Sequence, residues 1–65
     1  MNYDFNADEI LQMAEKIEKN GAAFYRECAG SVADPVAVQL LEKLAAMEDD
    51  HEKTFANIRS QLSAQ

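Results

Sequence analysis

Glu48 and His51, separated by two residues, interrupt an otherwise apolar stripe in the second half of the chain. Spacings of four and three residues alternate along this stripe, as they do on a helix face that packs against other helices. Its members are Ala37, Leu41, Leu44, Glu48, His51, Phe55, Ile58 and Leu62. A charge buried without a partner is strongly destabilising. A carboxylate and an imidazole one helical turn apart on such a stripe therefore need a reason, although a Glu-x-x-His pair alone is a weak signal for a metal site.

A third candidate ligand, Glu18, flanks a similar stripe in the first half of the chain. We interpret that stripe as the seam of a helix bundle; it consists of Ile10, Ala14, Ile17, Gly21, Phe24 and Cys28. Glu18 lies about 15 Å before the predicted end of its helix, and Glu48 about 20 Å after the predicted start of its own. In an antiparallel hairpin, Glu18, Glu48 and His51 would therefore lie within about one turn of one another.

The helix that carries Glu18 has a start signal and a stop signal. Asn6, with Glu9 three residues later, has the pattern of a helix N-cap and its partner. Gly30 is typical of a residue that ends a helix. These signals predict a helix over about residues 7–28.

A second start signal precedes the other stripe. Asp34 suits the N-cap position and Pro35 the first helical position. No glycine or proline follows, so this helix is predicted over about residues 35–63. The six-residue link, 29–34, fits an antiparallel pair of helices. We therefore expect an all-α fold, a two-helix hairpin that forms one domain over residues 1–65.

Size and charge limit the classes of function. A chain of 65 residues builds only a marginal core and usually needs a disulfide, a metal or a partner chain. Cys28 is the only cysteine, which excludes an internal disulfide and suits a reducing compartment. The net charge of −6 argues against nucleic acid or an anionic membrane as partner. We find neither a signal peptide nor a membrane-spanning run, which predicts a cytoplasmic protein.

Two hairpins together would complete a two-metal site. Carboxylate-bridged two-metal centres in four-helix bundles use two Glu-x-x-His pairs and two further glutamates, and Glu18, Glu48 and His51 are half of that set. A homodimer, or a higher even-numbered homo-oligomer, would supply four carboxylates to balance two divalent ions. Oxygen-rich ligation favours iron or manganese, and zinc could replace them without redox chemistry. The alternative is a metal-free ion pair of Glu48 with His51, buried or at a wet dimer seam.

Three further residues stand on or beside the first stripe. Tyr25, two turns after Glu18, could hydrogen-bond a metal ligand from behind, or it could belong to the core with its hydroxyl at the edge. Cys28 is expected to be a small buried hydrophobe. Gly21 is unexpected, because glycine inside a helix costs about 1 kcal/mol relative to alanine. It either makes room beside the metal ions or allows close helix packing.

Glu18-x5-Phe24-Tyr25, Asp34-Pro35 and Glu48-x-x-His51 together resemble the first half of rubrerythrin-type, ferritin-like proteins. The segments EKNGAAFYRECA and LLEKLAAMEDDHEKTF carry this likeness over most of the chain. The chain is also similar to encapsulated ferritins, which carry one such ligand set per chain and complete their di-iron centre by dimerisation. The resemblance implies a ferritin-like four-helix bundle made of two hairpins, with two iron ions per dimer and Glu18, Glu48 and His51 as ligands. It also implies a shell protein as a further partner.

Two departures from the resemblance bear on function. The extra glutamate that peroxidase-type rubrerythrins place one turn after a ligand would fall at Gly21, which favours a ferroxidase over a peroxidase. The final residues, SQLSAQ, do not look like a shell-targeting peptide. We therefore expect an oxidoreductase that oxidises Fe(II) with oxygen or peroxide. Two alternatives remain open: a non-enzymatic module that binds or carries metal, and a metal-free helical dimer that acts as a scaffold. The chain could also be a piece of a longer protein.

Overall fold

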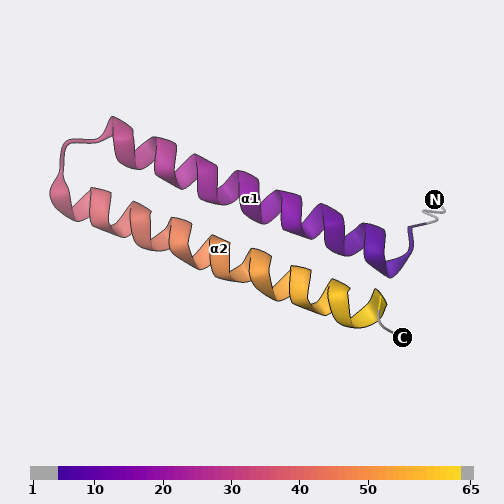
Figure 1. Cartoon of the computed structure of the whole chain (residues 1–65). Coiled ribbons are helices and arrows are strands. Elements are labelled where there is room, and N and C mark those ends of the chain that lie inside the picture. Colours follow the sequence, from indigo (N-terminus) through magenta and orange to yellow (C-terminus); the bar gives the residue numbers. More distant parts are fainter. Residues whose placement is uncertain (1–4, 64–65) are drawn as a thin grey trace.

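The computed structural model describes residues 5–63, which form two antiparallel helices lying side by side (Figure 1). Helix α1 runs over Ala7–Ser31 and helix α2 over Pro35–Ser63. The connection, residues 32–34, turns the chain so that the start of α1 and the end of α2 lie at the same end of the molecule (Figure 1). The predicted all-α hairpin is confirmed. Neither helix in this part of the chain combines the length and the apolar character needed to cross a membrane.

Local capping explains where both helices begin. The side chain of Asn6 accepts a hydrogen bond of 2.8 Å from the backbone N–H of Glu9, which satisfies one of the free donors of the first turn of α1. In the same way, a carboxylate oxygen of Asp34 accepts a 3.1 Å hydrogen bond from the backbone N–H of Val36. These are the two positions that the sequence indicates as N-caps.

Helix α1 ends later than its stop signal predicts. Gly30 has no left-handed backbone conformation and lies inside the helix, which continues to Ser31 rather than ending near residue 28. The Ser31 hydroxyl donates a 3.0 Å hydrogen bond to the carbonyl of Glu27 and so occupies one acceptor of the last turn. The expected six-residue link is therefore a connection of only three residues, 32–34.

The contact between the helices is narrow. Within residues 5–63, Ala22 in α1 and Ala45 in α2 are the only buried residues, and their small side chains let the two helices approach closely. Other side chains of the two helices are at most half-buried, among them Leu11, Leu41 and Phe55. A single layer of two helices has no second layer to cover it. The hairpin by itself therefore has almost no hydrophobic core.

The first apolar stripe lies only partly between the two helices, because Ala14, Gly21 and Cys28 are half-buried and its three large side chains are exposed. Its interpretation as the seam of a helix bundle stays a prediction. Ile17 and Phe24 are 66% and 61% exposed, whereas the residues that follow them, Glu18 and Tyr25, are half-buried. Two adjacent rows of residues, or columns, run along α1, one through Ile17 and one through Ala22. The column through Ala22 packs against α2.

Exposed apolar residues directly precede half-buried ones in both helices. We call six of these exposed residues the apolar face: Ile10, Ile17 and Phe24 in α1, and Leu40, Met47 and Ile58 in α2. In an antiparallel pair, positions just before the contact residues lie on the same side of the layer in both helices. His51 shares this side, because it follows Met47 by four residues and precedes Ile58 by seven. The opposite side carries the charged residues Lys19, Arg26, Glu42, Asp49 and Lys53.

Candidate metal centre

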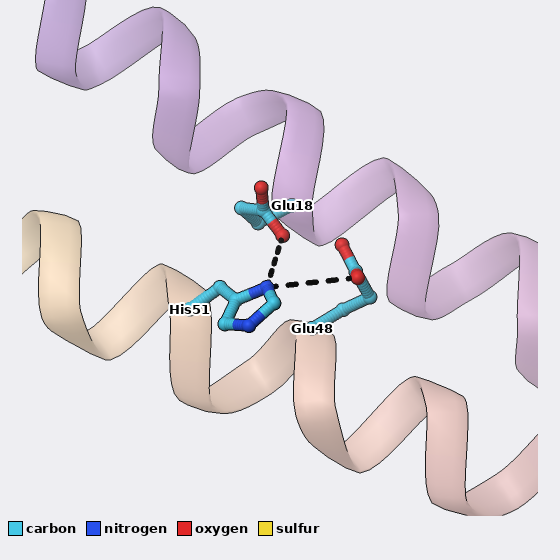
Figure 2. A group of neighbouring side chains, drawn as sticks. All are labelled: Glu18, Glu48 and His51. Carbon is cyan, nitrogen blue, oxygen red and sulfur yellow. Dashed lines mark ion pairs between the residues drawn. The ribbon is translucent and has the colours of Figure 1, made fainter.

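The three predicted ligands lie together between the middles of the two helices. Helix α1 contributes Glu18, and α2 contributes Glu48 and His51, whose side chains are one turn apart (Figure 2). The His51 Nδ1 atom lies 3.3 Å from Oε2 of Glu18 and 3.7 Å from Oε1 of Glu48. Each side chain offers one ligand atom, and these atoms all lie within 4.8 Å of one another. Three donors this close can coordinate a single ion.

The two carboxylates are covered and the imidazole is not. The side chains of Glu18 and Glu48 are 17% and 24% exposed, whereas that of His51 is 53% exposed on the apolar face. The Oε2 atom of Glu18 is fully covered and accepts no hydrogen bond in the part of the chain that the structure describes, because the nearby Nδ1 of His51 is not in hydrogen-bonding geometry. A buried carboxylate oxygen without a donor is unfavourable. A cation at this point would satisfy it.

Electrostatics give the same indication. The pKa of Glu48 is raised above its usual value, above all because its carboxyl group can share a hydrogen bond with that of Glu18. Partial burial and repulsion by the Glu18 charge raise this pKa further, while His51 acts in the opposite direction. One imidazole can neutralise at most one of two carboxylates, so an ion pair of the two glutamates with His51 leaves a negative charge. A divalent ion would balance both.

The neighbouring carboxylate of α1, Glu15, is occupied by a basic partner. Its Oε2 atom accepts a 2.7 Å hydrogen bond from Arg59 of α2, and the same guanidinium lies 3.0 Å from a carboxylate oxygen of Asp8. Glu15 is one turn before Glu18 in α1. Its pairing with Arg59 makes it part of the helix contact.

Asp49 and Glu52 of α2 also contact basic side chains of α1. Arg26 of α1 donates two hydrogen bonds to the carboxylate of Asp49, which lowers the pKa of Asp49 chiefly through the hydrogen bonds and also through the opposite charge. Lys19 of α1 lies 3.4 Å from Glu52. No sequence signal identified these pairs, because the partners are 23 and more residues apart and belong to no motif.

Tyr25 does not contact the three ligands. Its ring makes an edge-to-face contact with Phe24, with centroids 5.7 Å apart, and the structure of residues 5–63 gives its hydroxyl no hydrogen bond to Glu18, Glu48 or His51. Its role behind the ligands therefore stays a prediction, and its half-buried ring fits the alternative, a place at the edge of the core. Cys28 is a half-buried free thiol.

The fold is a helical hairpin in which two carboxylates and one imidazole converge, a group that could hold a metal ion. The profile of the Rubrerythrin family matches residues 9–65 of the chain, and the chain belongs to this family. This makes it a ferritin-like protein of a family that typically binds iron. Neither the curated proteins nor the solved structures that were searched contain a match.

The residues present fit an iron ion. Two carboxylates and one imidazole are a donor set suited to iron or manganese, and the covered Oε2 of Glu18 has no competing donor. The other carboxylates that lie between the helices already have basic partners. Glu18 and Glu48, which share only His51, are thus the carboxylates of the helix contact that are left to bind a cation.

Proposed function

We propose that two copies of this chain form a four-helix bundle that binds two iron ions at their interface and oxidises Fe(II) with oxygen or peroxide. The observation that carries this proposal is the covered, donor-free carboxylate oxygen of Glu18 beside Glu48 and His51. Glu18, Glu48 and His51 are the proposed ligands. Two Fe(II) ions held there would supply two electrons, which together with two protons from solvent would reduce oxygen to hydrogen peroxide, or hydrogen peroxide to water.

The donor set of one chain supports a paired site. Three ligand atoms leave coordination positions of a first-row metal ion open. Two carboxylates carry the charge to balance one divalent ion, and two chains carry the charge to balance two. A second copy that faces the first would bring its own Glu18, Glu48 and His51 to the same level, because all three lie near the middle of their helices.

The apolar face supports a second copy as the partner. Its six large side chains are each at least 40% exposed, and a contiguous apolar surface of this kind is typical of a protein interface. Ile17 and Met47 directly precede Glu18 and Glu48 in the sequence, and His51 lies on the same side. The face is therefore continuous with the open edge of the metal site. A self-complementary twofold interface would cover both at once.

The described surface favours small ions and oxygen over an organic substrate. Two surface hollows of about 340 and 330 Å³ lie towards the ends of the hairpin. The first is lined by Phe24, Glu27, Cys28, Ser31 and Val32, and the second by Glu15, Ala56, Arg59, Ser60 and Ser63. Neither hollow includes a proposed ligand. A cytoplasmic location, or one inside a shell formed by another protein, stays a prediction.

Metal content per chain, measured together with mass in solution, tests the proposal. We expect one ion per chain in a dimer or a larger even-numbered oligomer, and a melting temperature that rises on adding Fe(II) and falls on adding chelator. A helical dimer that binds no metal would contradict the proposal and indicate a scaffold.

Oxygen consumption tests the redox step separately. Adding Fe(II) to the metal-free protein in excess of its sites should cause repeated turnover, with peroxide formed or consumed in step with Fe(III). The Glu48→Ala variant is the matched control, because it keeps the helices but loses a ligand. Bound iron without turnover would indicate a metal carrier rather than a ferroxidase.

A further inference from the structure

Gly21 lies against the carboxylate of Glu48. A Cβ atom placed at Gly21 would be 3.1 Å from Oε2 of Glu48 and 3.6 Å from its Cδ and Cγ atoms. The first of these distances is tighter than nearly all contacts that real Cβ atoms make. The other glycine of α1, Gly30, would have nothing within 4 Å of such an atom. Of the two explanations for Gly21, room for a ligand is thus favoured over close packing of two backbones.

The two oxygens of Glu48 have different surroundings. Oε1 lies 3.7 Å from Nδ1 of His51, whereas Oε2 points at the backbone of α1 where Gly21 has no side chain. Figure 2 shows the Glu48 carboxylate reaching from α2 to the surface of α1, beside Glu18. Gly21 follows Glu18 by three residues and so lies one turn further along the same helix.

We propose that Gly21 is a positioning residue of the metal centre. Because it has no side chain, the carboxylate of Glu48 lies against α1, close enough to Glu18 and His51 to bind the same ion. This inference rests on the proposed function, because it assigns a role within that metal site.

The proposal predicts opposite effects of a methyl group in the metal-free and the metal-bound protein. Without metal, the carboxylate is the free end of a flexible side chain, which can move away by a few tenths of an ångström. With metal, ligand distances are fixed to within about 0.2 Å, so the same movement weakens a bond to the ion. Alanine is also the better helix former, which stabilises the metal-free chain.

The central experiment compares Gly21→Ala with Gly30→Ala, which makes the same chemical change where there is free space. Melting temperature without metal, mass in solution, and anaerobic Fe(II) and Mn(II) binding by calorimetry would be measured for each. We expect Gly21→Ala to melt no lower than wild type without metal, yet to bind each ion about tenfold or more weakly, the lower range seen when groups that orient ligands are removed. Gly30→Ala should bind both ions as wild type does.

A double variant separates the contact with Glu48 from any effect of the methyl group on the contact between chains. Glu48→Asp shortens the side chain and moves its carboxylate away from position 21. Glu48→Asp alone should weaken binding, but Gly21→Ala with Glu48→Asp should bind about fivefold or more tightly than the product of the two single losses predicts, as expected for residues in contact.

Three results would distinguish the possible failures. Wild-type protein that binds no metal would contradict the proposed function itself. Wild-type protein that binds metal, with Gly21→Ala binding equally well, would overturn the role of Gly21 alone. Weaker binding by Gly21→Ala without recovery in the double variant would also overturn it, because the methyl group would then act elsewhere than on Glu48.

Discussion

Two sets of carboxylates lie between the same two helices, and they differ in their partners. Glu15, Asp49 and Glu52 each contact an arginine or lysine of the other helix. Glu18 and Glu48, in the middle of the contact, have only one histidine between them. Glu15 and Glu52 are covered to the same extent as Glu18 and Glu48, whereas Asp49 is more exposed. What distinguishes a structural carboxylate from a candidate ligand in this hairpin is therefore an arginine or lysine partner on the other helix.

The largest expected effect comes from removing one of the two carboxylates that have no arginine or lysine partner. Glu48→Ala should abolish metal binding at both sites of a dimer, because each ion would be bound by ligands from both chains and both chains carry the change. The metal-free protein should melt no lower than wild type, since the change removes a partly buried carboxylate that is repelled by the charge of Glu18. Metal analysis and thermal denaturation check both parts. Unchanged metal content would show that the site lies elsewhere.

The apolar face is the next target, and Ala23 provides a matched control beside Phe24. Phe24→Glu places a charge on the apolar face, and because this side chain is 61% exposed the single hairpin should tolerate it. We expect the dimer to dissociate about a hundredfold more readily, since buried aromatic residues dominate such interfaces, and metal binding to fall with it. Ala23→Glu adds the same charge at another exposed position. Sedimentation equilibrium should show monomers for the first variant and dimers for the second.

Removing a basic partner should affect stability and leave the metal site intact. Arg59→Ala breaks the contacts with Glu15 and Asp8, so the melting temperature should fall by a few degrees. Exposed ion pairs contribute little, which keeps this effect small. Iron binding should stay within about twofold of wild type, as expected for sites that share no partner. A loss of bound iron comparable to that in Glu48→Ala would contradict the distinction between carboxylates with an arginine or lysine partner and the two proposed ligands.

The smallest effect is a difference in titration between two neighbours in the sequence. In the metal-free protein, the pKa of Glu48 should lie above 4.5 and that of Asp49 below 3.8. A raised pKa means that the contribution of Glu48 to stability is present at low pH and lost as the pH rises through its folded-state value. The contribution of Asp49 is instead lost as the pH falls through its lowered value. Carboxyl chemical shifts followed by NMR would measure both, and equal pKa shifts of the same sign would contradict the comparison.

The features that depend on local sequence could be predicted. Asn6 and Asp34 act on backbone groups two or three residues away, so they mark the helix starts without reference to the rest of the fold. The convergence of Glu18 with Glu48 and His51 follows from the helix rise and a short connection. The end predicted for α1 from Gly30 was wrong, because a glycine ends a helix in this way only when its backbone turns into the left-handed region. The backbone of Gly30 does not.

The side of each helix that faces the other could not be predicted. Ile17 and Glu18 lie on adjacent columns of α1, and periodicity alone does not decide which column faces α2. Contacts such as that of Arg26 with Asp49 join residues from opposite helices, and they help to fix the rotation of each helix about its axis. That rotation decides which apolar side chains remain outside. Composition does not contain this information.

The near-absence of an interior, with only two alanines buried in residues 5–63, has a consequence for how the chain would fold. If the second copy supplies the missing core, as proposed, folding is a second-order process. The midpoint of unfolding then depends on protein concentration, as it does for obligate dimers. A newly made chain at low concentration would then stay unfolded, and proteases could cleave it until it dimerises. Expression level, as well as iron supply, would decide how many molecules survive to do chemistry.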